Sequence, residues 1–373
     1  MQQLDARSAT WLMFVVVSST ATLYLPAISV SQAQNGAWLS PVLAAPFGFL
    51  TYGLLRTLHR HHPGKSFTAI ALSVFGPVIG RVIAVLMAVF LWQAGVIVLR
   101  QLLGFIKMFI LLDSPPVIVS FILSITIWIA LRYHVSVFAK VNQVMAIALT
   151  GLLGLLLINT VSDIHISAFT PWIESGVKGI MRGAIVPTTW YAQIFLLSFM
   201  WSEMRPDETA LLDRKMIWML SGTTVLLVIV NIDVLGVLGV QEGARSGFPT
   251  LEIARYVQIG IGGYIQRVDM LFIIPWLFAI IFKVIVFYYG ACVIVRDLLK
   301  HKTFDAFGAG LVFSGMGVVL EAFPKDSITS YFITYDWPPY GLFFELGIPM
   351  LLVITSLIRF RQQKLLSGAG EPS

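Results

Sequence analysis

The sequence predicts an all-α integral membrane protein with ten transmembrane helices in a five-plus-five inverted repeat. Its 373 residues are 57% hydrophobic and only 12% charged, with a mean hydropathy of +0.85, whereas a soluble domain carries about 25% charged residues. Ten apolar stretches are long enough to span a bilayer. The third observation is that prolines interrupt the first and the sixth stretch, the same place in each half.

A helix crosses the bilayer with about 20 mostly apolar residues. In chain order, the stretches that meet this requirement cover residues 9–30, 37–58, 74–99, 116–132, 136–159, 177–203, 215–240, 268–295, 306–323 and 340–360. Residues 100–112 either extend the third span or form a re-entrant segment. We therefore expect residues 1–373 to form one polytopic membrane domain, with repeat one over about 9–159, repeat two over about 177–360 and a short cytoplasmic tail at 361–373.

The loop charges predict the orientation. With both termini on one side, that side holds fifteen of the 25 Lys and Arg residues, the other side holds eight, and Arg81 and Lys283 fall within spans. Cytoplasmic loops carry the excess of positive charge, so both termini are predicted to be cytoplasmic. The net charge of +6 is scattered over short loops, which favours membrane topology over nucleic-acid binding.

Pro26 follows the polar run 18–22 in the first span, and Pro187 precedes two threonines in the sixth. A proline removes a helical hydrogen bond, and lipid offers the freed carbonyl no water. Simple kinks are one explanation, because proline is common in membrane helices. The matched positions favour broken helices, as in inverted-repeat transporters, where the freed groups face a midplane pocket. The helix dipoles at such breaks suit a zwitterion such as an amino acid.

The residues predicted to line this pocket lie beside the two prolines and on the third and eighth spans. They are Thr22, Tyr24, Leu25, Pro26, Thr188, Thr189, Tyr191, Trp92, Gln93 and Tyr288. A structural alternative stands beside each assignment. Hydroxyl groups in membrane helices often bond back to their own backbone, and aromatic residues often serve as packing or interfacial anchors.

Lys283 lies near the centre of the eighth span. A charged side chain there costs about 3 kcal/mol on insertion scales and usually has a partner or a function. The alternative is that the lysine extends its ammonium to an interface.

Several polar residues near the predicted outer side also need partners. Asp233, beside Asn231 in the seventh span, is expected to form a structural ion pair with Arg255 or another outer cation rather than a proton relay. Residues 250–263 predict an amphipathic interfacial helix, because apolar and charged positions alternate at helical spacing. Glu252 and Arg255, with Arg267 and Asp269, form either an ion network that fixes this helix as a lid or a surface for partner subunits.

The sequence gives no support for catalysis or a cofactor. The run of four basic or imidazole residues at 59–62 is interpreted as a topology determinant rather than a metal site, because no cysteine or paired carboxylate accompanies it. The motifs of serine hydrolases, zinc proteases and phosphate-binding loops do not occur. Cys292 is the only cysteine, so no internal disulfide is possible.

Residues 248–290 resemble the signature region of the GerAB-type spore germination proteins. The block contains an aromatic-Pro-x-Leu-Glu-x-Ala-Arg stretch and an Arg-x-Asp that begins the eighth span. The stretches "NGAWLSPVL" (35–43) and "ESGVKGIMRGAIVPTTW" (174–190) support the resemblance. Together with ten spans and a similar length, the resemblance covers essentially the whole chain.

This resemblance implies the LeuT-like fold of the amino acid–polyamine–organocation transporter superfamily. Its members are B subunits of nutrient germinant receptors in the inner membrane of bacterial endospores, and they associate with A and C subunits. Their germinants are typically amino acids such as L-alanine. In this superfamily the first and eighth spans pack together, so the Lys283 ammonium is expected to replace a coupling sodium ion near Pro26. Ala192-Gln193 departs from a Gly-Glu of many relatives, and thereby removes a carboxylate partner for a ligand ammonium.

Two functions follow as expectations. The first is a germinant-sensing receptor subunit that binds a small molecule in a midplane pocket and signals through partner subunits. The alternative is a proton- or sodium-coupled amino-acid permease. A third possibility, a membrane scaffold with a vestigial pocket, differs from both because it would bind no ligand.

Overall fold

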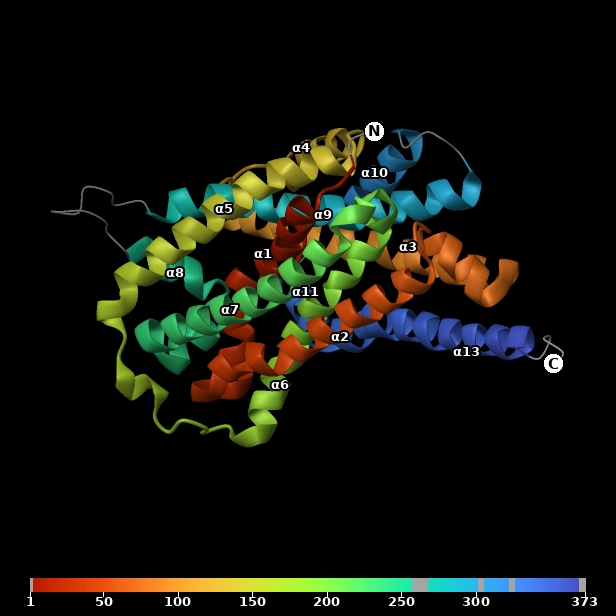
Figure 1. Cartoon of the computed structure of the whole chain (residues 1–373). Coiled ribbons are helices and arrows are strands. Elements are labelled where there is room, and N and C mark those ends of the chain that lie inside the picture. The colour runs from red at the N-terminus through yellow and green to blue at the C-terminus, as the bar shows by residue number, and fades with distance from the viewer. Residues whose placement is uncertain (1–2, 257–267, 301–304, 322–325, 369–373) are drawn as a thin grey trace.

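The computed structural model describes residues 3–256, 268–300, 305–321 and 326–368, and these residues are overwhelmingly helical (Figure 1). The α-helices are α1 (Ala6–Ala33), α2 (Ser40–His61), α3 (Phe67–Phe109), α4 (Pro116–Leu131), α5 (Val135–Thr160), α6 (Gly176–Ala192), α7 (Thr209–Arg245), α8 (Pro249–Tyr256), α9 (Val268–Leu299), α10 (Asp305–Glu321), α11 (Asp326–Tyr331), α12 (Trp337–Leu342) and α13 (Ile348–Gly368). Short 3-10 or π-helical segments join several of them, namely η1 (Gln34–Leu39), η2 (Val161–Asp163), η3 (Ile166–Phe169), η4 (Gln193–Phe199), η5 (Trp201–Glu203), η6 (Pro206–Glu208), η7 (Phe332–Asp336) and η8 (Phe343–Gly347).

The predicted multi-pass membrane protein is confirmed, whereas the count of ten spans is not reproduced one for one. Among the described residues, six helical segments are long and apolar enough to cross a membrane. The first, Ala6–His61, contains two predicted spans, and the shorter apolar helices Pro116–Leu131 and Ala306–Glu321 correspond to the fourth and ninth. The sixth predicted span is divided between α6 and η4.

Helix α1 lies at the centre of the bundle, where it packs against α5, α6, α7, α8 and α9. Every residue from Leu12 to Leu23 is buried, as expected for a helix that is apolar on all sides and surrounded by protein. In Figure 1 the α5–α6 connection and α8 lie toward one end of the bundle, and the C-terminus of α13 lies at the other. We call the first of these the outer end, following the predicted topology.

The two proline-containing helices behave differently. Helix α1 passes through Pro26 without interruption, in place of the predicted break. Helix α6 also continues past Pro187, but at Gln193 it changes to the 3-10 segment η4. A change from α to 3-10 geometry inside a span often marks a functional hinge. The discontinuity of the sixth span therefore lies six residues beyond its proline.

Two long helices contain real kinks, both at glycine. In α3 the backbone of Gly76 has φ +82°, and Pro77 begins the following helical segment. In α7 Gly239 has φ +75°. Residues with a side chain rarely adopt this conformation. Beyond its kink α3 continues to Phe109, so residues 100–109 extend the third span rather than folding back.

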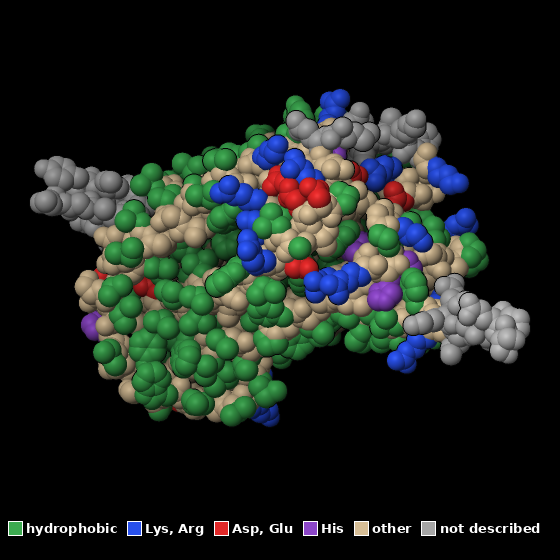
Figure 2. Space-filling view, in the orientation of Figure 1, with side chains coloured by type: hydrophobic (Ala, Val, Ile, Leu, Met, Phe, Trp, Pro, Cys, Tyr) green, Lys and Arg blue, Asp and Glu red, His purple; other side chains and the backbone are tan. Residues whose placement is uncertain are grey.

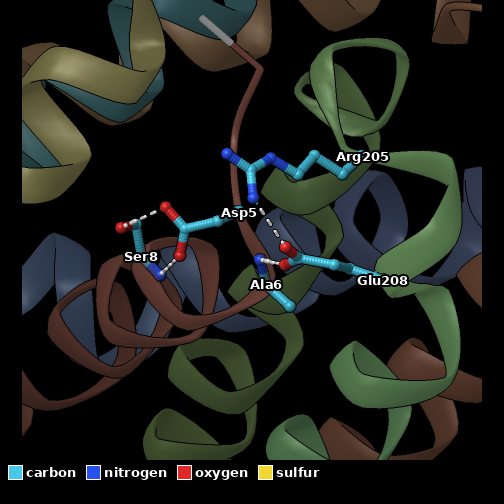
Figure 3. A network of polar contacts seen from close by, with 5 residues as sticks. All are labelled: Asp5, Ala6, Ser8, Arg205 and Glu208. Carbon is cyan, nitrogen blue, oxygen red and sulfur yellow. Dashed lines mark hydrogen bonds and ion pairs between the residues drawn. The ribbon is translucent and has the colours of Figure 1, made fainter.

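The N-terminal segment is tied to the chain that follows the sixth span (Figure 3). The Leu4 amide donates to the Glu203 carbonyl at 2.8 Å, and the Arg205 amide donates to the Leu4 carbonyl at 3.1 Å. The Glu208 carboxylate accepts from the Ala6 amide at 2.6 Å and from Arg205 at 3.0 Å. These contacts close the end of the bundle opposite the outer end, where α1 and α7 both begin.

Helix α8 is an internal element rather than the predicted interfacial helix. Thr250, Leu251, Ile253 and Ala254 are all at most 1% exposed, and the helix packs on α1, α7 and α9. Its apolar face therefore meets protein instead of lipid. The predicted continuation through Ile261 lies outside the described residues.

Candidate functional site

The central feature of the bundle is a fully buried lysine in α9. Lys283 is 0% exposed, and its ammonium donates a hydrogen bond to the Thr20 hydroxyl of α1 at 2.7 Å. This placement excludes the alternative that Lys283 reaches an interface. The contact is with the polar run of α1, as expected, but with a side-chain hydroxyl rather than with carbonyls freed near Pro26.

Glu345 supplies the opposite charge, and sequence reasoning missed it. This residue lies in η8, is 0% exposed, and is close enough to Lys283 and Gln193 for electrostatic interaction with both. Its carboxylate oxygens have no hydrogen-bond partner among the described residues. A lone carboxylate inside the last predicted span was the signal that could have found it. We refer to Thr20, Gln193, Lys283 and Glu345 as the central cluster.

A small cavity of about 20 Å³ adjoins this cluster, which is room for about one water molecule. Lys283 and Gln193 line it, together with Gln101 of α3 and Trp190 of α6. The site is therefore closed: the Lys283 ammonium and two amide groups line a space too small for an amino acid, and Glu345 is not part of that lining.

A larger cavity of about 440 Å³ lies on the outer side of this cluster, within the range of small-molecule sites. Gln101 and Ile333 line both cavities, so these two side chains separate them. The larger cavity, which we call the outer vestibule, is also lined by Tyr24 and Arg100. The Tyr24 ring packs edge-on against Phe248, with centroids 5.0 Å apart.

Trp92 and Gln93 lie at a third space instead. They line a cavity of about 420 Å³ between α3, α10 and α12. The Trp92 indole donates to the Leu311 carbonyl at 2.9 Å, and Gln93 accepts a hydrogen bond from the Tyr340 hydroxyl. Trp337 lines both this side cavity and the small central one.

In the sixth span the structure brings different residues to the centre than those predicted. The hydroxyls of Thr188 and Thr189 bond back to carbonyls of their own helix, at 2.8 Å each. Tyr191 points toward α7, where it donates to Thr224 at 2.9 Å. Trp190 and Gln193 are the residues of this span that line the central cavity. They are three positions apart and so share a helix face.

Tyr288 lies on another side of α9 from Lys283. Its ring is close to Gly95 of α3, and its hydroxyl is close to Gly315 of α10, while the hydroxyl has no hydrogen-bond partner among the described residues. Five positions correspond to about 140° around a helix, which accounts for the separation. Leu25 and Pro26 are buried in α1.

The carbonyl that Pro26 frees, that of Thr22, has a specific partner. The Thr250 hydroxyl of α8 donates to it at 2.8 Å. One turn earlier the Trp276 indole of α9 donates to the Ser19 carbonyl at 2.6 Å. The Thr250 hydroxyl thus satisfies the one carbonyl that the proline frees, which is consistent with α1 remaining helical there.

The outer polar residues adopt other pairings than predicted. Asp233 accepts from the Thr160 hydroxyl at 2.5 Å, rather than pairing with Arg255. The Arg255 guanidinium lies over the Phe109 ring, 4.7 Å from its centroid. Arg267 and the side chain of Asp269 lie outside the described residues, so the predicted ion network with Glu252 stays a prediction. At 59–62, His59 stacks on Trp201 at 4.3 Å, and His62 contacts the Ser356 hydroxyl at 2.9 Å.

A multi-pass helical bundle with a buried, charged centre below an outer vestibule defines a class: membrane proteins with a transporter-like fold. Solved structures support this class. A substrate-bound, outward-open Na⁺-coupled sialic acid symporter matches with a TM-score of 0.65 and 12% identity, over 95% of this chain and 89% of the symporter. A manganese transporter of Eremococcus coleocola matches with a TM-score of 0.58 and 13% identity, over 98% and 89% of the two chains. These neighbours are transporters of LeuT-like fold.

A family model described as "Spore germination protein" matches residues 3–327, and the chain belongs to this family. Among curated proteins, spore germination protein KB of Bacillus subtilis (strain 168) is 23% identical over 278 residues, which are 73% of either chain. The predicted family and the predicted LeuT-like fold are thus confirmed.

Proposed function

We propose that this chain is the germinant-sensing B subunit of a spore nutrient receptor. It binds a small zwitterion, such as an amino acid, at the central cluster. The observation that supports this most is that two fully buried groups of opposite charge, Lys283 and Glu345, interact electrostatically, and that Lys283 lines a cavity that adjoins the outer vestibule. A zwitterion offers a carboxylate to the lysine and an ammonium to the glutamate. Glu345 thereby supplies the carboxylate that Gln193 does not.

Binding requires the centre to open. In the proposed sequence of events, the ligand enters the vestibule, displaces Gln101 and Ile333, and takes over the charge interactions of Lys283 and Glu345. The Lys283–Thr20 hydrogen bond, which joins α9 to α1, is then exchanged for contacts with the ligand. A ligand shifts the helix arrangement only if it binds the open state more tightly. The open state signals to A and C subunits in the spore inner membrane, with both chain termini cytoplasmic.

A proton- or sodium-coupled amino-acid permease is the second candidate. The similarity to solved transporters, including a Na⁺-coupled symporter, favours it. In a permease the repeats 9–159 and 177–360, if related by inversion as we propose, would rock to open the centre to each side in turn.

The experiment measures binding of labelled L-alanine and a small amino-acid panel to protein in nanodiscs, and uptake into proteoliposomes under proton and sodium gradients. Saturable binding without accumulation is expected for the sensor. Accumulation driven by either gradient would establish the permease instead. Failure of every amino acid to bind would contradict both. Co-purification with A- and C-type subunits tests the partners separately.

A further inference from the structure

A surface groove lies where α1, α5 and α7 meet, away from the central cluster. Its volume is about 800 Å³. Arg7 of α1 and Arg214 and Lys215 of α7 stand at one end, and Trp11, Trp218 and Ile229 belong to the apolar remainder. Figure 2 shows Lys and Arg side chains, with Asp and Glu side chains among them, in the middle of this face and apolar side chains covering the surface farther from it. We call this feature the α1–α7 groove.

The three cations have no carboxylate partner of their own. Arg7 and Arg214 are exposed and Lys215 is half-buried, and in the part of the chain that the structure describes no acidic side chain forms an ion pair with them. The nearest carboxylates along the sequence are held elsewhere: Asp5 by Ser8, Glu208 by Arg205 and Asp213 by Arg56. The three cations that line the groove therefore remain available to an anionic group.

The position of the charge along the helices matches a membrane interface. Arg214 and Lys215 lie in the second turn of α7, at the end of the bundle that the loop charges predict to be cytoplasmic. Trp11 and Trp218 lie within a turn of these cations, and tryptophan is enriched at the headgroup level of membranes. Trp218 is 73% exposed, although its neighbours Met219 and Leu220 are buried in the bundle.

The apolar part of the groove has the length of an acyl chain. From Arg214 to Ile229 is fifteen positions, which is about 22 Å along a helix at 1.5 Å per residue. One leaflet of the hydrocarbon core is about 15 Å deep, half of a core of about 30 Å. A lipid whose headgroup sits at the cations can therefore lay a whole acyl chain along the groove.

We propose that the α1–α7 groove binds one anionic phospholipid. Its phosphate contacts Arg7, Arg214 and Lys215, and one acyl chain lies against Trp218 and the apolar wall up to Ile229. Basic pockets between membrane helices on the cytoplasmic side select anionic headgroups in this way. Because the lipid bridges the first turn of α1 and the second turn of α7, it stabilises the closed end of the bundle. This site is separate from the germinant site.

The first test removes the charge. Wild-type protein and the triple variant Arg7→Gln/Arg214→Gln/Lys215→Gln are reconstituted with phosphatidylglycerol or phosphatidylcholine, and retained lipid is counted by native mass spectrometry. Each cation near an anionic headgroup contributes about fivefold in binding, so the triple variant is expected to bind phosphatidylglycerol about 100-fold more weakly. The matched control Arg60→Gln/Lys65→Gln/Arg361→Gln, on the same predicted side but outside the groove, should retain the lipid.

The second test fills the groove without changing charge. A Cβ at Gly222 meets nothing within 4 Å, and Gly222 lines the groove. Gly222→Leu therefore occupies groove space without a clash in the core. It should lose the phospholipid, whereas Gly53→Leu, at an equally open position on α2, should not. Both variants should keep the wild-type unfolding temperature in lipid-free detergent micelles.

Either of two results would overturn the proposal. One is equal retention of phosphatidylglycerol and phosphatidylcholine, or equal loss in the triple variant and its control. The other is that Gly222→Leu keeps its lipid but fails to co-purify with a partner subunit that Gly53→Leu still binds, which would make the groove a protein interface. Germinant binding by the triple variant is expected to be unchanged. A failure of the lipid proposal is therefore distinguishable from a failure of the proposed germinant-sensing function.

Discussion

Lys283 and Glu345 set the energetics of the centre because each charge is fully buried. They interact electrostatically without a direct ion pair between them. Removal of one partner from a buried pair of charges leaves the other without compensation, at a cost of up to about 3–5 kcal/mol. The two residues therefore depend on each other. The same dependence is what a ligand with two opposite charges would exploit.

We expect Lys283→Met to lower the stability of the fold by up to about 3–5 kcal/mol, because Glu345 loses its electrostatic interaction with the lysine. The double variant Lys283→Met/Glu345→Gln should recover a large part of that loss. Thermal unfolding in nanodiscs measures both. Tyr288→Phe, in the same helix, removes a buried hydroxyl that has no hydrogen-bond partner among the described residues, and should unfold like the wild type. If the destabilisation of the double variant equals the sum of those of Lys283→Met and Glu345→Gln measured singly, the two residues do not stabilise each other and the prediction is contradicted.

The Thr250 hydroxyl donates to the Thr22 carbonyl that Pro26 leaves free. Stability should therefore depend on the hydroxyl of Thr250 more than on the shape of its side chain. Thr250→Val keeps the shape and leaves the Thr22 carbonyl unsatisfied in a buried place, which costs about 1–3 kcal/mol. Thermal unfolding is again the measurement. Thr57→Val is the control, because the Thr57 hydroxyl is exposed and bonds only its own helix. Equal small effects at both positions would mean that another group satisfies the carbonyl.

At the scale of elements, helices α8 and α9 supply the three side-chain donors from other helices that, among the described residues, bind the polar run of α1. Thr250 and Trp276 bind backbone carbonyls, and Lys283 binds the Thr20 hydroxyl. These donors belong to residues 248–290, the block that resembles the germination-protein signature. The block is therefore the part of the chain that fixes α1, and through α1 the centre.

The kinks in α3 and α7 depend on backbone conformation rather than on space. A Cβ at Gly76 or Gly239 meets nothing within 4 Å, yet both residues have φ between 75° and 82°. Gly76→Ala and Gly239→Ala should each lower stability by about 1–3 kcal/mol, the cost of holding such a conformation with a side chain. Gly53→Ala, at an open helical position, should be neutral or stabilising. Thermal unfolding that ranks all three alike would contradict this reading of the kinks.

The start of α1 should make stability depend on pH. Burial alone would raise the pKa of the Asp5 carboxyl. Hydrogen bonds from the Ser8 amide and hydroxyl outweigh this effect and hold that pKa below its usual value. A lowered folded-state pKa contributes stability above the unfolded pKa of about 3.9, and this is lost as the pH falls through the folded value. Asp5→Ala should therefore destabilise by about 1 kcal/mol at neutral pH. The difference from wild type should shrink in acid; a constant difference from pH 7 to pH 2 would contradict the cap.

At the scale of the whole molecule, the sequence patterns predicted the features that local composition decides, which are the helices, the family and the fold class. Apolar length predicts helices, and the described residues of all ten predicted stretches are almost entirely helical. The resemblance in residues 248–290 predicted the family and the LeuT-like fold. The need of Lys283 for a buried partner was also predictable, because a charge in the middle of a span has few alternatives.

Tertiary partners decided the rest. Whether Pro26 breaks α1 depends on Thr250, which lies 228 positions from the Thr22 carbonyl that it binds. Lys283 likewise binds Thr20, 263 positions away. Glu345 lies in a span chosen only for its hydropathy. In the sixth span, helical phase rather than proximity to Pro187 decides which residues face the centre, so Trp190 and Gln193 take the place of the threonines.

The arrangement of the whole bundle indicates a closed state. The outer vestibule adjoins the central cluster from one end, while contacts of Leu4 and Ala6 with residues 203–208 tie the other end shut. A ligand from the outer side thus meets Gln101 and Ile333 before it reaches Lys283. Opening of this separation is the step that a sensor would couple to its partners.

The most direct measurement is equilibrium binding of labelled L-alanine and a small amino-acid panel to four proteins in nanodiscs: wild type, Lys283→Met/Glu345→Gln, Glu345→Asp and Tyr288→Phe. The proposed site predicts saturable binding by wild type and Tyr288→Phe, weaker binding by Glu345→Asp, and loss of binding in the double variant despite a folded bundle. Undiminished binding by the folded double variant would contradict the central cluster as the germinant site.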